Sequence, residues 1–165
     1  MVFEYTNEDN FENFLCFYVT KYPFAGRNEK GQTLAHKIAE CGYEKVCKLI
    51  ASCNKDVSKI QDNFGETFLH ICAEKKLDSV CITALEANPN LAEIQNNAGD
   101  TFIHKSALAG NENVCVKAVQ VRPSLIMKKN MLARTFLHCM RDKLSMIKCV
   151  DIYNQAQKAN KGKEE

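Results

Sequence analysis

The sequence predicts an all-α protein of about four stacked helix-turn-helix units, each with a projecting turn that we call a finger. The prediction depends on three residue types that recur at one interval. The histidines of the chain stand 34 residues apart, at His36, His70, His104 and His138. A threonine lies three positions before each histidine, and a cysteine lies eleven positions after it. Such self-similarity indicates one structural unit that is copied and packed side by side.

Residues 1–27 are expected to form a helical cap at the N-terminus. A helix is predicted over 10–21, where apolar residues recur at helical spacing. These residues are Phe11, Phe14, Leu15 and Tyr18. An array of stacked units needs atypical ends, because an inner unit left open would expose its stacking face. We therefore expect this apolar row to cover the open side of the first unit.

The units themselves are expected over residues 28–61, 62–95, 96–129 and 130–154. Each opens with a turn in which glycine, or alanine in the last unit, stands two residues before the threonine. Glycine suits a left-handed turn position, and the threonine hydroxyl can cap the helix that follows. The histidine occupies the place of a capping-box partner and can reach back to the cap. A short first helix is therefore expected after each threonine, as over 34–41 in the first unit.

The residues that end this first helix differ among the units. Gly42 and Gly110 supply a helix stop in units one and three. Lys76 and Leu144 stand at the same place in units two and four, where a left-handed backbone is strained. We therefore expect units two and four to fray first.

A second helix is expected in each unit. Its apolar positions follow the pattern i, i+1, i+4, i+5, which makes a single helical stripe. The expected starts are Glu44, Asp78, Glu112 and Ser145. Pro89 and Pro123 end this helix in units two and three. After the fourth unit, residues 155–165 are expected to form a polar tail rich in lysine.

This order of elements, with Gly-x-Thr followed three residues later by His, resembles the ankyrin repeat. The matching stretches begin at Gly31, Gly65, Gly99 and, with alanine in place of glycine, Ala133. The resemblance covers residues 28–153 and implies an ankyrin-repeat solenoid. The sequence departs from the family in its period of 34 residues, one more than usual, and in lacking the proline after each threonine. Tetratricopeptide repeats share the 34-residue period, but their signature tryptophan is absent from this chain.

Composition argues against several classes of function. The net charge is +2, from 22 basic and 20 acidic side chains, so no long-range field favours nucleic acid or an anionic membrane. No apolar run approaches the roughly 18 residues that a membrane helix needs. The chain has nine cysteines but no Cys-x-x-Cys pair and no Sec-type signal, which predicts buried thiols rather than disulfides or zinc. We expect a cytoplasmic or nuclear protein in a reducing compartment.

The histidines and cysteines also raise the question of catalysis or metal binding. Stacked units lie about 10 Å apart, whereas a metal ion needs its nitrogen ligands at about 2 Å, so four imidazoles cannot share one ion. We expect each histidine instead to join its own turn to the neighbouring one by hydrogen bonds. A cysteine–histidine hydrolase would use His70 with Cys72, or His138 with Cys139, but residues so close in sequence do not face each other on a helix. The sequence therefore predicts no enzyme, no metal and no cofactor.

The resemblance implies a non-catalytic protein–protein interaction module. Partners of ankyrin proteins bind along the finger tips and the outward residues of the first helices. Carried over position by position, this gives Lys30, Gln32, Glu40, Asn63, Phe64, Glu66, Glu74, Asn97, Asp100, Leu108, Met131, Leu132 and Arg134. The apolar members, Phe64, Leu108, Met131 and Leu132, are candidate anchors of an interface. The alternative is that these side chains fold back onto the next finger.

Two interpretations of the biological role stay open. The chain is similar to short, stand-alone arrays of pathogens, namely viral inhibitor-of-kappa-B mimics or bacterial effectors that act in a host cell. Alternatively, it is a fragment of a larger host protein in which the array positions another domain. Under both interpretations the expected partner is another protein, not nucleic acid or a membrane, and the free chain is expected to be monomeric.

Overall fold

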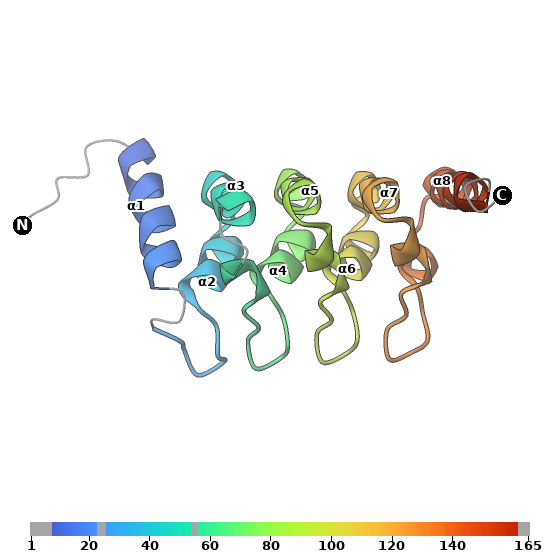
Figure 1. Cartoon of the computed structure of the whole chain (residues 1–165). Coiled ribbons are helices and arrows are strands. Elements are labelled where there is room, and N and C mark those ends of the chain that lie inside the picture. The colour runs from blue at the N-terminus through green and yellow to red at the C-terminus, as the bar shows by residue number, and fades with distance from the viewer. Residues whose placement is uncertain (1–7, 23–25, 54–55, 162–165) are drawn as a thin grey trace, which may run out of the picture.

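The computed structural model describes residues 8–22, 26–53 and 56–161 (Figure 1). The protein is all-α: these residues form α-helices and short 3-10 helices, and no strand occurs among them. Three pairs of helices, each a first helix and a second helix, lie side by side in one row. The pairs are α2 (Leu34–Cys41) with α3 (Glu44–Cys53), α4 (Phe68–Glu74) with α5 (Asp78–Ala87), and α6 (Phe102–Ala109) with α7 (Glu112–Val121).

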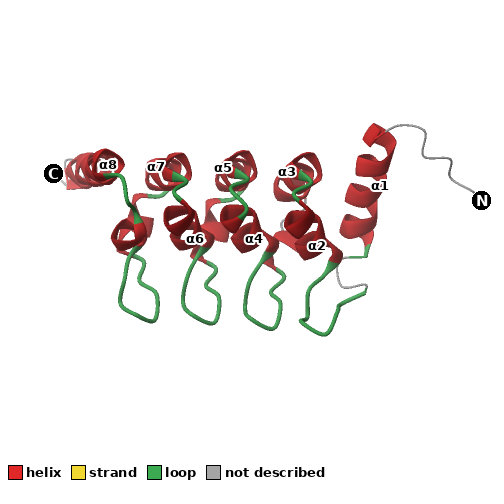
Figure 2. Cartoon of the chain, turned by 180° about the vertical axis from the view of Figure 1, so that it is seen from behind, coloured by secondary structure: helices red, strands yellow, loops and turns green. Residues whose placement is uncertain are grey.

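The helices of the row form two layers (Figure 2). First helices pack on first helices, α2 on α4 and α4 on α6, while second helices pack on second helices, α3 on α5 and α5 on α7. Fingers project from the first-helix layer, on the side away from the second helices. Short 3-10 helices lead from each second helix toward the next finger: η1 (Val57–Lys59), η2 (Pro89–Glu93) and η3 (Pro123–Met127). The expected starts of the second helix at Glu44, Asp78 and Glu112 are confirmed.

Apolar side chains from every unit form one continuous core, which runs from Val19 in α1 to Cys149 in α8. Its largest buried members include Phe68, Phe102 and Phe136, which follow the capping threonines. Each ring belongs to the core cluster and stands at the first residue of α4, α6 or the 3-10 helix over Phe136–Cys139. Replacing such a buried ring by alanine typically lowers stability by about 3–5 kcal/mol. The aromatic residues therefore supply packing energy that a proline at this place would not.

The N-terminal cap is helix α1 (Glu8–Lys21), which packs mainly on α3. Its buried contacts come from Leu15 and Val19, one helical turn apart. Phe14 and Tyr18 are 38% and 37% exposed, and Tyr18 lines a hollow with Thr33 and Leu34 of the first unit, so these rings cover that unit only in part. The two rings also contact each other, with centroids 6.0 Å apart. The side chain of Phe11 lies outside the described residues.

The fourth unit differs from the expected pattern. In place of a first α-helix it has the 3-10 helix η4 (Phe136–Cys139), because Met140 continues in extended backbone and buries its side chain. The last helix, α8 (Lys143–Lys161), begins two residues before the expected Ser145. Its start is capped by Asp142, whose carboxylate accepts a hydrogen bond from the backbone N–H of Ser145 at 2.7 Å. Because α8 already contains Leu144, the first helix that was expected to stop at this residue does not end there.

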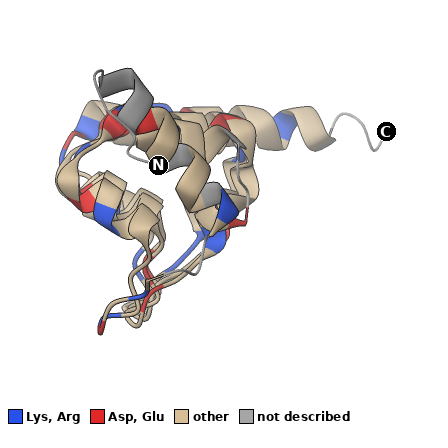
Figure 3. Cartoon of the chain, turned by 90° about the vertical axis from the view of Figure 1, so that its left-hand side faces the viewer, with Lys and Arg blue, Asp and Glu red and all other residues tan. Residues whose placement is uncertain are grey.

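The same helix replaces part of the expected polar tail. The boundary expected at residue 155 falls inside α8, which continues without interruption to Lys161 and projects beyond the shorter helices of the row (Figure 3). Its sequence there is as polar as expected. No helix in the part of the chain that the structure describes is long and apolar enough to cross a bilayer.

Candidate protein-binding surface

Each of the first three fingers is joined to its own first helix and to the next finger through a histidine. In the first unit, Nδ1 of His36 accepts a hydrogen bond from the backbone N–H of Thr33 at 3.1 Å. Its Nε2 lies 2.9 Å from the backbone carbonyl oxygen of Glu66 in the next unit. Because a carbonyl can only accept and a backbone N–H can only donate, the proton of this neutral ring sits on Nε2. The expected role of the histidines as links between turns is confirmed for His36, His70 and His104, whereas His138 bonds only within its own unit.

The link repeats in the next two units with buried rings. Nε2 of His70 donates to the carbonyl of Asp100 at 3.0 Å, and Nε2 of His104 donates to the carbonyl of Arg134 at 3.1 Å. Burial lowers the pKa of His70 to about 4, and it also lowers the pKa values of His36 and His104. Both nitrogens of each ring are thus occupied by hydrogen bonds, which leaves no lone pair for a metal ion.

Backbone hydrogen bonds tie neighbouring fingers directly to each other. The N–H groups of Asn63, Asn97 and Met131 donate to carbonyls of the preceding finger at 2.9–3.0 Å. Within a finger, an Asp or Asn side chain holds the turn, as when the carboxylate of Asp62 accepts from the N–H groups of Phe64 and Glu66. The fingers therefore form a rigid series with regular spacing, although the backbone within each finger has no regular secondary structure.

The close approach of the fingers depends on the turn glycines. Gly65 has a left-handed backbone with φ of +74°. A Cβ atom placed there would lie 2.6 Å from Oδ1 of Asn97 and 2.8 Å from its backbone nitrogen, far inside van der Waals contact. A Cβ atom placed at Gly99 would likewise lie 2.6 Å from the backbone nitrogen of Met131. Glycine is needed here both for the backbone conformation and for the space.

Most of the predicted partner-binding side chains are exposed on the finger face, which we define as the finger tips plus the outward side of the first helices. The exposed ones are Lys30, Asn63, Phe64, Glu74, Asn97, Leu108, Met131, Leu132 and Arg134. Glu40, Glu66 and Asp100 are partly buried. In contrast, Gln32 is only 6% exposed, so its expected outward position is wrong. Its side chain accepts from Asn28 and donates to Glu40, which fastens the finger to α2 instead.

The apolar members of this set stay in solvent and do not fold back onto the next finger. Met131 is 78% exposed and Leu132 is 69% exposed, both at the tip of the fourth finger. Leu108 on α6 and Phe64 at the second finger tip are also more than half exposed. Three of these four residues lie in units three and four. The apolar part of the finger face is therefore concentrated in its C-terminal half.

The N-terminal half of the finger face contains a hollow of about 520 Å³ between units one and two. The side chains that line it are mainly polar: Gln32, Glu40, Cys41, Glu66, Ile71, Glu74 and Lys75. Four of them belong to the predicted partner-binding set. Along the described ribbon, positions of basic residues and of acidic residues are interspersed (Figure 3).

Lys105, which the sequence did not single out, organises this half of the surface. Its Nζ lies 2.9 Å from Oε1 of Glu66 and 3.5 Å from Oε1 of Glu74. Burial alone would raise the pKa of Glu66, but the hydrogen bond and charge of Lys105 outweigh it and hold this pKa below its usual range. The same pair raises the pKa of Lys105 against the effect of burial. The one sequence feature that could have indicated this role is that Lys105 is a charged residue on the outward side of a first helix.

The cysteines considered for hydrolysis have unfavourable surroundings. Burial raises the pKa of the Cys72 thiol well above its ordinary value, and it also raises the pKa of Cys139. The nucleophilic form of cysteine is the thiolate, which both environments disfavour. The alternative of a cysteine–histidine hydrolase therefore receives no support from the electrostatics of either thiol.

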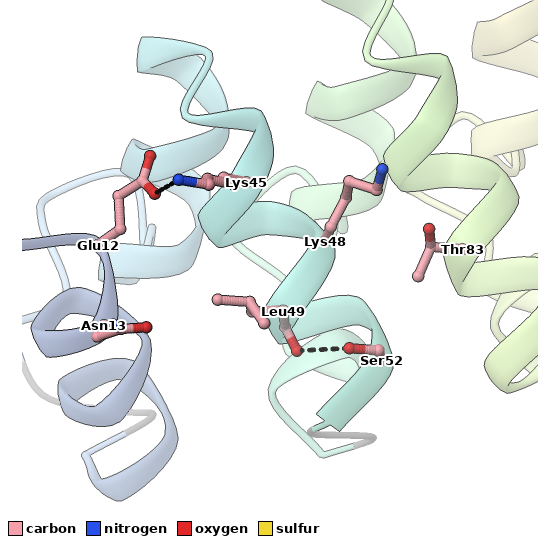
Figure 4. Close-up of a pocket in the computed structure, with 7 residues that line it drawn as sticks. All are labelled: Glu12, Asn13, Lys45, Lys48, Leu49, Ser52 and Thr83. Atoms are coloured by element: carbon pink, nitrogen blue, oxygen red, sulfur yellow. Dashed lines mark hydrogen bonds and ion pairs between the residues drawn. The ribbon is translucent and has the colours of Figure 1, made fainter. Parts of the chain in front are cut away.

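A second hollow of about 600 Å³ lies in the other layer, among α1, α3 and α5 (Figure 4). Lys48 stands in this hollow at the position that is apolar in the other units: Ile82, Val116 and Val150. A lysine does not fill the seam toward the next second helix as Ile82 and Val116 do. This hollow, which no feature of the sequence indicated, is separated from the finger face by the first-helix layer.

Comparison with known proteins does not assign the chain to a family. The sequence matches no family model and no curated protein. The finger face is therefore the feature of this chain that bears on function. Its main property is that rigid, hydrogen-bonded fingers hold apolar side chains in water without covering them.

Proposed function

We propose that the chain is an ankyrin-repeat array that binds another protein through its finger face and has no catalytic role. The repeat assignment is supported by the capping threonines, the histidine links and the packing of like helices on like. The functional proposal is carried by one observation: the exposed apolar residues of units three and four, on fingers that adjacent backbone hydrogen bonds keep in place.

The physical advantage of such a surface is preorganisation. A partner that binds to it does not have to order the fingers, so less of the interaction energy is lost as conformational entropy. Met131, Leu132 and Leu108 would be desolvated at the centre of the contact. The polar residues of units one and two would form its rim, where charged pairs contribute mainly to specificity.

The resemblance favours an inhibitor or effector that acts by covering a surface of a protein in a host cell. A reducing compartment suits this role, because the core contains buried free thiols such as Cys47 and Cys81. Burial raises the pKa of Cys81 above the range in which thiolates form, which protects it from reaction.

Site-specific photo-cross-linking tests the proposal. A photoreactive residue would be placed at Ala98 on a finger tip and, as a control, at Gln120 on the outer side of α7; both positions are exposed. We expect a defined protein from a host-cell lysate to be captured from position 98 and not from position 120. Capture at position 98 should be lost in Leu132→Asp. Equal capture from both positions, or capture that Leu132→Asp leaves intact, would contradict the proposal.

A further inference from the structure

The C-terminal edge of the row carries residues that neighbouring units bury elsewhere. The rings of His36, His70 and His104 are buried beneath the next unit, whereas His138 is exposed. In the described part of the chain, no hydrogen-bond partner exists for Nε2 of His138. Val116 on α7 is 9% exposed beneath α8, but its equivalent on α8, Val150, is 39% exposed. The fourth unit thus presents an open stacking edge.

The finger layer of this edge is closed to another finger. The residue equivalent to Gly65 and Gly99 in unit four is Ala133, which keeps the left-handed backbone with φ of +56°. In the earlier units a Cβ at this place would collide with the next finger. The methyl group of Ala133 therefore occupies the space that a fifth finger in the same register would need. A further unit of the same kind does not fit against unit four.

The last helix carries exposed apolar side chains at and beside this edge. Leu144 and Ile147 are 75% and 58% exposed and form a row with Val150 on successive turns of α8; of the three, Val150 is at the stacking position, because the counterparts of the other two in unit three, Gly110 and Asn113, are also exposed. The other end of the array shows how such a layer is covered by one helix: α1 packs on α3 through Leu15 and Val19. The ligand that fits the C-terminal edge is therefore a helix without a finger.

We propose that this helix is α8 of a second copy of the chain, packed antiparallel with a two-fold axis near Ile147. The exposed row is symmetric about that residue, so Leu144 of one copy would face Val150 of the other. The same arrangement brings Lys143, an exposed cation, to the level of the exposed carboxylate of Asp151 in the other copy, twice in the dimer. Self-complementarity of this kind closes a pair and stops there. The inference goes beyond the proposed function and replaces the expectation of a free monomer.

Sedimentation equilibrium of the full chain, from about 5 µM to about 500 µM, tests the dimer in the range of weak association. We expect the average mass to rise with concentration from 18.7 kDa toward twice that value. Ile147→Asp should raise the dissociation constant at least about tenfold, because it places a charge in the contact. Leu132→Asp, an equally drastic change of an exposed residue in the same unit, should leave it unchanged.

A charge exchange tests the antiparallel arrangement. Lys143→Asp should weaken the dimer, and adding Asp151→Lys to it should restore the affinity of the unaltered chain. Both residues are exposed, so the fold is not at risk, and circular dichroism would verify this. A constant mass of 18.7 kDa at every concentration, or a dimer that survives Ile147→Asp, would overturn the proposal. Failure of the double exchange to restore affinity would overturn the antiparallel pairing.

Discussion

Nε2 of His70 lies 3.0 Å from the carbonyl oxygen of Asp100, thirty residues further along the chain. The ring is fully buried, and its Nδ1 accepts from the backbone N–H of Thr67 at 3.1 Å. One side chain thus satisfies backbone groups of two successive units.

Replacing His70 by alanine should lower the free energy of unfolding by about 2–4 kcal/mol, because it leaves a cavity and two unpaired backbone groups. Urea unfolding followed by circular dichroism measures this loss. His138→Ala is the matched control: its ring is exposed and lacks the link to a following unit, so we expect a loss below about 1 kcal/mol. Equal losses in the two variants would show that the link between units contributes nothing.

Stability should fall as the solution is acidified from neutral pH. The pKa of His70 is lowered to about 4 in the folded state from an ordinary value of 6.5, so the unfolded chain binds the proton more readily between these values. The contribution is complete above about pH 6.5 and is lost as pH falls toward 4, amounting to about 3 kcal/mol for this one ring. Urea unfolding at several pH values measures it. A His70→Gln variant should show a distinctly shallower pH dependence; an unchanged slope would contradict the assignment.

Two glycines with the same backbone conformation should respond differently to alanine. Gly42 has φ of +77° and no atom within 4 Å of an added Cβ, whereas the Cβ of an alanine at Gly65 would meet Asn97 at 2.6 Å. We expect Gly42→Ala to lower the free energy of unfolding by about 1 kcal/mol through backbone strain alone. Gly65→Ala should lower it by at least about 2–3 kcal/mol, because strain and collision add. Thermal unfolding of both variants makes the comparison, which similar losses would refute.

The Phe64→Ala and Leu132→Ala variants should each weaken binding to a captured partner by about tenfold, as truncation of an interface anchor does. Their melting temperatures should stay within about 2 °C of the unaltered chain, because both side chains are exposed and add little to the core. Isothermal titration and differential scanning calorimetry supply the two measurements. A lower melting temperature with unchanged affinity would mean that these residues stabilise the fold and do not recognise a partner.

Removal of Lys105 should raise the lowered pKa of its carboxylate partner, Glu66. In Lys105→Met, burial of Glu66 is opposed only by the hydrogen bond from Asn96 and the charge of His70, so the pKa of Glu66 should rise from its lowered value. Carboxyl chemical shifts followed by NMR during an acid titration report this pKa. Lys37→Met is the control, since Lys37 pairs with Glu40 at 2.6 Å and should change the pKa of Glu40 alone. A pKa of Glu66 that stays low without Lys105 would assign the shift to another group.

Much of the fold could be predicted because the determinants are local and repeated. Capping threonines, turn glycines and apolar stripes act within one turn of helix, so they place the starts at Glu44, Asp78 and Glu112 correctly. Unit four departs from the pattern because Asp142 caps α8 before a first helix can form. Asp142 competes with the repeat pattern for the start of the last helix. Only the three-dimensional structure shows which of the two determines that start.

The candidate surface was predictable in outline but not in each side chain. The fingertip residues Met131 and Leu132 are exposed as the repeat pattern predicts. Gln32 turns inward because Asn28 and Glu40 offer hydrogen bonds from separate segments, and Lys105 matters because Glu66 lies in another unit. The Gln32 contacts are local and the Lys105–Glu66 contact joins two units, but a period of 34 residues carries no information about any of these side-chain pairings.

The close approach of Gly65 to Asn97 fixes the spacing between neighbouring fingers. Loops on protein surfaces usually tolerate insertions and deletions. Here, one residue gained or lost between two fingers would move the glycine out of line with its neighbour and misalign every later contact. Residues at the finger tips can therefore be substituted freely during evolution. The length of the chain, in contrast, can change only by whole units.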